Sequence, residues 1–175
     1  SAIALDPSDV GVVNNLAVLY RDRGDRDQAI ALWRSVLPLA DASVRLSYAH
    51  ALVERGGRVE AERIFMQVLA SQPDNASALR GMAAVHMLAG QYEQAMLHAQ
   101  RAVQAEQVNP QGWVMMSQLQ MAMGQFAQAE QALLQGLHRA KPELPVQQQL
   151  HKLWMQNKPP HQVLTLVGQW LIQQP

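Results

Sequence analysis

The sequence predicts an all-α fold, an α-solenoid of stacked antiparallel helix pairs, and three observations carry this prediction. First, the motif Gly-x-x-x-[Glu/Gln]-Ala occurs four times, beginning at Gly24, Gly56, Gly90 and Gly124. Second, these copies lie 32, 34 and 34 residues apart, and a period of this length is typical of stacked two-helix units. Third, Ala, Leu, Gln, Met and Arg are abundant, and these residues favour helices.

When the repeats are aligned on this glycine, each is predicted to consist of a first helix (helix A), a tight turn at the glycine, and a second helix (helix B). Residues 1–9 are predicted to be the tail of a preceding repeat, and the chain to form one continuous solenoid domain. The repeats are predicted at 10–41, 42–75, 76–109 and 110–143, with a degenerate fifth repeat at 144–175. In the third repeat, helical spacing predicts one buried stripe of Leu79, Met82, Ala83 and His86, and another of Ala95, Ala99, Ala102 and Val103.

Small residues recur where the two helices of each repeat are predicted to cross. Because small side chains let helix axes approach closely, we expect each pair to pack tightly. The glycine that follows helix A is expected in a left-handed conformation, which costs glycine little. The predicted helix A and helix B partners are Ala17 with Ala29, Ala49 with Ala61, Ala83 with Ala95, and Ser117 with Ala129.

Prolines modify the first and the fifth repeat. Pro38 cannot continue a helix interior, so helix B of the first repeat should end or kink near residues 36–37. In the fifth repeat, Lys158-Pro159-Pro160 replaces the glycine turn. Since proline is accepted in the first turn of a helix, helix B of that repeat is expected to begin near Pro160.

These landmarks resemble those of the tetratricopeptide repeat family, whose unit of about 34 residues follows the pattern W-x-x-L-G-x-x-Y, then A-x-x-x-F, then P. The resemblance covers nearly the whole chain and implies a right-handed superhelix whose concave face, lined mainly by helix A, binds other proteins. The matching residues in the first two repeats are Val13, Leu16, Ala17, Tyr20, Ala29 and Trp33, then Arg45, Tyr48, Ala49, Leu52, Ala61, Phe65 and Pro73. Later repeats supply Leu79, Met82, Ala83, His86, Ala95 and Ala99, then Trp113, Met116, Ser117, Gln120, Ala129 and Leu133.

Composition narrows the class of function. The formal net charge is zero, whereas a nucleic-acid binder carries a basic footprint. There is no cysteine, which excludes disulfides and thiolate metal sites and leaves the redox compartment open. A composition low in Lys and rich in Arg, Gln, Ala and Met is typical of a bacterial protein, so the candidate compartments are the bacterial cytoplasm and periplasm. The N-terminal residues lack a signal-peptide pattern, and the longest apolar run, 163–172, is shorter than the about 20 residues of a membrane span. No membrane insertion is therefore expected.

Short motifs that could carry chemistry have simpler interpretations. The acidic cluster of Asp22, Asp25 and Asp27 is interleaved with arginines and lacks the ligand order of a calcium loop. Arg23-Gly24-Asp25 spells an adhesion tripeptide whose glycine the repeat already explains, and Asn75-Ala76-Ser77 matches a glycosylation acceptor at a position where Asn suits a helix cap. We expect no catalytic residue, no metal and no cofactor, so the chain is not predicted to be an enzyme.

The candidate binding surface consists of helix A residues that face away from helix B. Chaperone-binding members of the resembled family use a Lys/Asn/Arg clamp, but the matching places hold Asn14, Val18, Ser47, Ser77 and Gly81, so no such clamp is expected. Several methionines on this surface would adapt to an apolar partner. The candidate residues are Asn14, Val18, Arg21, Leu46, His50, Val53, Arg80, Ala84, Met87, Val114, Gln118, Met121, Gln148 and Lys152.

The sequence thus predicts a non-catalytic protein–protein interaction scaffold that binds a partner peptide or helix in the concave groove. An alternative is the regulatory or substrate-presenting arm of a larger bacterial protein, such as a polysaccharide export or secretion protein or a transferase. A third is self-assembly: the repeats at the two ends are expected to expose uncapped apolar faces, through which a homodimer would form.

Overall fold

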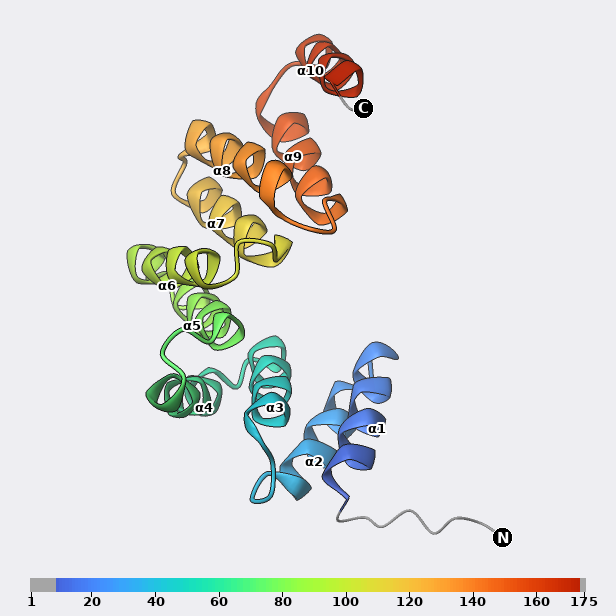
Figure 1. The fold of residues 1–175 in the computed structure, drawn as a ribbon, viewed down its shortest axis with the longest axis vertical. Coiled ribbons are helices and arrows are strands. Elements are labelled where there is room, and N and C mark those ends of the chain that lie inside the picture. Colours follow the sequence, from blue (N-terminus) through green and yellow to red (C-terminus); the bar gives the residue numbers. More distant parts are fainter. Residues whose placement is uncertain (1–8, 174–175) are drawn as a thin grey trace, which may run out of the picture. The chain divides into compact units, whose positions relative to one another are not determined.

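The computed structural model describes residues 9–173, which form ten α-helices and no strand (Figure 1). The all-α prediction is confirmed. The predicted tail at residues 1–9 lies, apart from Asp9, outside the described residues, as does Pro175. The helices are α1 (Val10–Asp22), α2 (Arg26–Val36), α3 (Ala42–Arg55), α4 (Arg58–Ser71), α5 (Ala76–Leu88), α6 (Tyr92–Ala105), α7 (Pro110–Ala122), α8 (Phe126–Arg139), α9 (Leu144–Asn157) and α10 (Pro160–Gln173).

Four helices begin at an Asp or Asn cap, and the caps are spaced like the motif glycines. Asp9, Asp41, Asn75 and Asn109 precede α1, α3, α5 and α7, and each side-chain oxygen accepts a backbone N–H of the first turn at 2.9–3.0 Å. Such a bond satisfies an N–H that the helix itself leaves unpaired. The Asn75 side chain is therefore used as a cap, as the sequence suggested.

The motif glycines end these same helices. Gly24, Gly56, Gly90 and Gly124 have φ angles of 91°, 90°, 74° and 74°, and no other described residue has a positive φ. The left-handed conformation predicted for the four glycines is confirmed. A residue with a Cβ would be strained there, so the glycine allows the chain to reverse into the next helix.

Small residues separate the two helices of each pair. All eight residues of the predicted crossings, Ala17, Ala29, Ala49, Ala61, Ala83, Ala95, Ser117 and Ala129, have 0% exposure. The hydroxyl of Ser117 donates to the carbonyl oxygen of Val114 at 2.8 Å, so the buried serine leaves no unpaired donor. The small-residue prediction is confirmed at every position.

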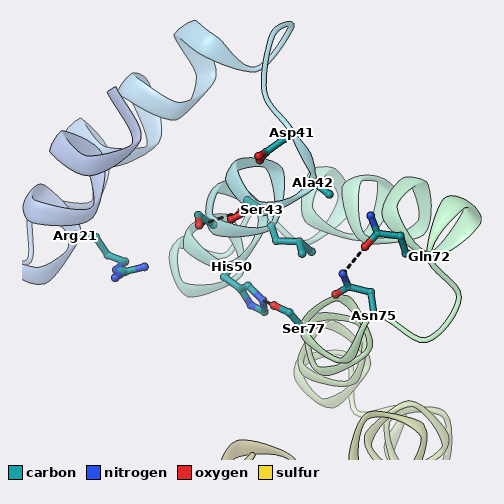
Figure 2. Close-up of a pocket in the computed structure, with 10 residues that line it drawn as sticks. Arg21, Asp41, Ala42, Ser43, His50, Gln72, Asn75 and Ser77 are labelled. Atoms are coloured by element: carbon teal, nitrogen blue, oxygen red, sulfur yellow. Dashed lines mark hydrogen bonds between the residues drawn. The ribbon is translucent and has the colours of Figure 1, made fainter. Parts of the chain in front are cut away.

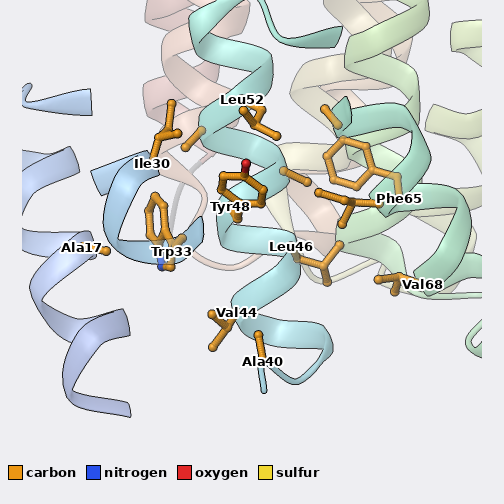
Figure 3. Close-up of a cluster of buried hydrophobic side chains, with 14 of the residues drawn as sticks. Ala17, Ile30, Trp33, Ala40, Val44, Leu46, Tyr48, Leu52, Phe65 and Val68 are labelled. Atoms are coloured by element: carbon orange, nitrogen blue, oxygen red, sulfur yellow. The ribbon is translucent and has the colours of Figure 1, made fainter. Parts of the chain in front are cut away.

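The chain divides into two compact units, residues 1–98 and 99–175, each with its own core. In the first unit, Trp33, Tyr48 and Phe65 are fully buried (Figure 3). The indole of Trp33 donates to Asn14 Oδ1 at 2.9 Å. Helix α5 passes so close to Phe65 that a Cβ on Gly81 would lie 2.2 Å from the ring, hence only glycine fits there.

The core of the second unit is built around Trp113, Leu133, Leu150 and Trp154. The indole of Trp113 donates to the carbonyl oxygen of Gln107 at 2.8 Å. The indole of Trp154 donates to Glu130 Oε1 at 2.7 Å, and Lys158 Nζ lies 3.2 Å from Glu130 Oε2. Each large ring therefore has a partner for its one polar atom.

Both proline predictions are confirmed, and one burial prediction is wrong. Helix α2 ends at Val36, and α10 begins at Pro160. His86, by contrast, is only half-buried. Its ring stacks on His98 at 5.3 Å between centroids, and its Nδ1 lies 2.7 Å from Gln91 Oε1, so its polar atoms stay near the turn rather than in the core.

Candidate binding groove

One pocket of the first unit is an open groove of about 690 Å³ between α1, α3 and the start of α5. Figure 2 shows Arg21 on one side, Asn75 and Ser77 on the other, and His50 between them. We call this surface the A-helix groove. Its lining residues are Arg21, Asp41, Ala42, Ser43, Leu46, Ser47, His50, Gln72, Asn75 and Ser77.

His50 forms the centre of the groove. Its Nε2 lies 3.0 Å from Ser77 Oγ, and its ring packs at 5.1 Å, tilted, on the buried Phe65. Burial lowers the pKa of His50, and the positive charges of Arg80 and Arg21 lower it further, against the opposing effect of Glu54. The imidazole is therefore neutral at pH 7 and provides a hydrogen-bonding group without charge.

The walls of the groove carry small polar groups held by local bonds. Ser47 Oγ donates to the carbonyl of Ser43 at 3.2 Å, and the Asn75 amide donates to Gln72 Oε1 at 2.8 Å. Arg21 pairs with Asp22 at 2.9 Å, and its side chain is 34% exposed. A hydroxyl that donates to a carbonyl can still accept, so the groove offers both donors and acceptors to a polar ligand.

Three of the predicted site residues, Arg21, Leu46 and His50, come together in the A-helix groove. Others of the first unit have structural contacts: Asn14 accepts the Trp33 indole, and Val18 and Val53 pack on the core. Arg80 lies near enough to His50 to lower its pKa. Ala84 and Met87, farther along α5, are half-buried and line none of the pockets described for this unit.

The predicted residues of the second unit do not form one site. Val114 and Met121 pack against the core, and Met121 Sδ accepts the Gln149 amide at 3.5 Å. Gln118 and Lys152 are exposed. Gln148 lines a separate, mostly apolar cavity of about 280 Å³ with Leu137, Gln147, Leu150, His151, Trp154 and Val167.

The sequence prediction missed the groove residues that come from turns and first helical turns. These are Asp41, Ala42, Ser43, Gln72, Asn75 and Ser77, and Ser47, one turn farther into α3, was missed as well. Asp41 and Asn75 recur with the same 34-residue spacing as Gly56 and Gly90, and this spacing could have located this wall of the groove. Ala42 and Ser43 repeat as Ala76 and Ser77 at the same 34-residue spacing, whereas Ser47 and Gln72 follow no such pattern.

Metal clusters and membrane-spanning helices are both absent from the described part of the chain. Among residues 9–173, no three His, Asp or Glu side chains gather in a way that could hold a metal ion. No helix in that range is long and apolar enough to cross a membrane.

Comparisons with known proteins identify the fold and the repeat. Sequence models of the tetratricopeptide repeat match residues 12–40, 52–113 and 86–153. The chain is similar in structure to a thermophilic tetratricopeptide repeat protein of Thermus thermophilus, with a TM-score of 0.78 and 17% identity over 94% of this chain and 91% of that one. A search of curated proteins finds no match.

Two further solved structures have the same fold. A chain of the APC/C hetero-tetramer Cut9–Hcn1 matches with a TM-score of 0.74 and 18% identity, over 91% of this chain and 32% of that chain. Pseudomonas aeruginosa pilF matches with a TM-score of 0.68 and 20% identity, over 83% of this chain and 68% of that chain. Since the repeat models together match more than half of its residues, the chain belongs to the tetratricopeptide repeat family.

Proposed function

We propose that this protein is a non-catalytic interaction scaffold that holds a peptide or helix of a partner protein in the A-helix groove. The tetratricopeptide fold supports protein binding in general. The observation that carries the finer proposal is the groove itself, an open cavity of about 690 Å³ between three first helices of successive pairs. A cavity of this size accommodates a few side chains of an extended peptide.

The lining suggests how such a peptide would be held. His50 is neutral, and Ser47, Ser77 and Asn75 provide uncharged donors and acceptors. Leu46, with 7% exposure, gives the floor an apolar spot. The groove therefore suits a polar, extended segment with one small apolar side chain, held mainly by hydrogen bonds.

A tryptophan scan with a matched control tests the proposal. Ser47→Trp would fill the groove, since Ser47 lines it and is only half-buried. Ser35→Trp is the control, because Ser35 is an exposed residue of α2, outside the groove, and its hydroxyl also donates to a nearby helix carbonyl, that of Leu32, at 2.7 Å. Peptides selected from a random phage-displayed library on the wild-type chain would then be measured on both variants.

The expected result is a loss of affinity of about tenfold or more for Ser47→Trp, because a filled pocket excludes the ligand, and no change for Ser35→Trp. Circular dichroism would show that both variants keep their helicity. Peptides that bind Ser47→Trp as well as wild type would place the binding surface elsewhere and refute the proposal.

A second candidate is that the array is the regulatory or substrate-presenting arm of a larger protein. The match to the Cut9–Hcn1 chain favours it, because there an array of this size is 32% of a longer polypeptide. The reading frame of the full-length gene tests this candidate: a fused transferase or export domain would support it, and the absence of any further domain would overturn it.

Self-association through an apolar end face is the third candidate. Leu19 on α1 and Leu164 on α10 are 57% and 74% exposed. Sedimentation velocity at several concentrations tests it, with Leu19→Glu and Leu164→Glu expected to abolish any dimer.

A further inference from the structure

The first unit contains a second pocket, which shares no residue with the A-helix groove. It encloses about 320 Å³ between the end of α2, the turn after it, α3 and α4. We call it the arginine pocket. Its lining residues are Arg34, Leu37, Pro38, Arg45, Arg63, Ile64 and Gln67.

Three guanidinium groups and no carboxylate line this pocket. One of the arginines, Arg34, pairs with an acid outside the lining, Glu60. Glu60 Oε2 lies 3.7 Å from Arg34 Nη2, and Glu60 Oε1 accepts a hydrogen bond from the Tyr48 hydroxyl at 2.8 Å. If the negative charge of Glu60 neutralises one arginine, the pocket has a net charge of two positive charges, although the formal net charge of the whole chain is zero. The excess is therefore local and points to an anionic ligand.

Two of the arginines are fixed in place by hydrogen bonds that their Nε atoms donate. Arg34 Nε donates to the Tyr48 hydroxyl and Arg45 Nε to the carbonyl of Ala40, both at 3.0 Å. The terminal nitrogens of Arg45 make no hydrogen bond among the described residues, and the exposed side chain of Arg63 makes none at all there. A fixed guanidinium loses less entropy when it binds a carboxylate through two parallel hydrogen bonds.

The floor of the pocket is apolar. Ile64 is 2% exposed and belongs to the core, Leu37 is half-buried, and Pro38 adds a rigid apolar ring. A phosphate or a sugar–phosphate chain would satisfy the arginines but leave this floor uncovered. An apolar side chain flanked by carboxylates would satisfy both parts.

We propose that the arginine pocket is a second docking site, which binds an acidic peptide segment with one aliphatic side chain inserted between Leu37 and Ile64 and flanking carboxylates on Arg34, Arg45 and Arg63. The site lies apart from the A-helix groove, so the scaffold can hold two partner segments at once. Its failure leaves the proposal for the groove intact, because the two pockets share no lining residue.

Fluorescence anisotropy with labelled synthetic peptides tests the proposal. The probe is Gly-Asp-Glu-Leu-Glu-Asp-Gly, and the comparison peptides replace either its acids by Gln and Asn or its Leu by Ser. At about 50 mM salt, where screening is weak, we expect the probe to bind about tenfold more tightly than either comparison peptide. Binding of the probe should weaken as salt rises.

Variants connect the binding to the pocket. Arg63→Gln should weaken binding of the probe about fivefold through loss of a charged hydrogen bond. The change breaks no hydrogen bond or ion pair within the described residues. Arg23→Gln is the matched control, since Arg23 is exposed, lies outside the pocket and has no side-chain bond in the described structure. Ser47→Trp should leave binding of the probe unchanged.

Three results would overturn the proposal. Equal binding of the Leu and Ser peptides, or equal competition by inorganic phosphate or a short single-stranded DNA at the same charge concentration, would show a simple anion site. Equal weakening by Arg63→Gln and Arg23→Gln would show attraction by overall charge rather than a pocket.

Discussion

The two compact units stabilise similar helix pairs by different chemistry. In the first unit, Arg26 pairs with Glu54 at 3.0 Å, and Arg55 pairs with Asp27 through two bonds of 2.5 and 3.1 Å, both between α2 and α3. In the second unit, the indole N–H groups of Trp113 and Trp154 donate side-chain hydrogen bonds, as Trp33 does in the first unit. The ion pairs are exposed to solvent, and the indole bonds are partly buried.

The sequence explains this difference. Beyond Glu106 the acidic residues are Glu130 and Glu143 alone, so the second half of the chain cannot form many ion pairs. Exposed ion pairs contribute about 0–1 kcal/mol each and are screened by salt, whereas a buried bond to a charged acceptor contributes about 1.5–3 kcal/mol. The first unit should therefore respond to salt and pH, and the second to changes in its aromatic core.

The largest expected effect tests whether the two units are energetically separate. Phe65→Ala removes a fully buried ring from the first unit and should cost about 3–5 kcal/mol. Because Phe65 belongs to the core of the first unit alone, we expect faster amide hydrogen exchange in α3–α5 and unchanged exchange in α8–α9. Leu133→Ala, in the core of the second unit, is the reciprocal control. Uniform acceleration in both units by either variant would contradict the separation.

The next effect compares one indole in each unit. Trp33→Phe loses a bond to a neutral amide, Asn14, whereas Trp154→Phe loses a bond to the carboxylate of Glu130. Both variants lose a similar side-chain volume. The lost hydrogen bond should lower the free energy of unfolding by about 1 kcal/mol in Trp33→Phe and by about 2 kcal/mol in Trp154→Phe. Urea unfolding, monitored by amide hydrogen exchange in each unit, measures both losses of stability. Equal costs would mean that the charge on Glu130 adds nothing, for example because Lys158 already satisfies it.

Much of the fold could be predicted from local residue types. The motif glycines adopt positive φ, and the eight small residues at the crossings are fully buried, because both features depend on the backbone of a single helix pair. The end of α2 at Val36 and the start of α10 at Pro160 were predictable from the restricted backbone of proline. Such rules act over a few residues and are readable without a structure.

The candidate sites could be predicted only in part, because they depend on side chains far apart in the sequence. Asn14 was expected in the groove, but its amide oxygen is taken by Trp33, 19 residues away. The arginine pocket collects Arg34, Arg45 and Arg63 from three helices, and no periodicity marks them. In helical repeats, the position of a residue on its helix can be predicted from the sequence, whereas the residue to which its polar atoms hydrogen-bond cannot.

A smaller effect concerns pH and the first unit. Burial lowers the pKa of His50 below its ordinary value of 6.5. The unfolded chain therefore binds a proton at His50 more readily than the folded chain does. The contribution of neutral His50 to the stability of the fold is complete above about pH 6.5 and is lost as the pH falls below that value. We expect the free energy of unfolding of the wild type to fall between pH 7.5 and 5.5 by more than that of His50→Gln. Parallel pH profiles for the two proteins would contradict this.

The smallest expected effect separates the two units by salt. Arg55→Gln breaks the exposed pair with Asp27, in which the side chains are 59% and 73% exposed, so the cost should be at most about 1 kcal/mol at low ionic strength. At about 1 M salt the Debye length is near 3 Å, and the cost should vanish. The matching change in the second unit, Lys158→Gln, removes a pair whose side chains are 26% and 24% exposed. Its cost should persist in salt, since a partly buried pair is screened less. Urea unfolding of both variants at low and high salt measures the contrast, and an equal salt response would show that the two units do not differ in how their charges are used.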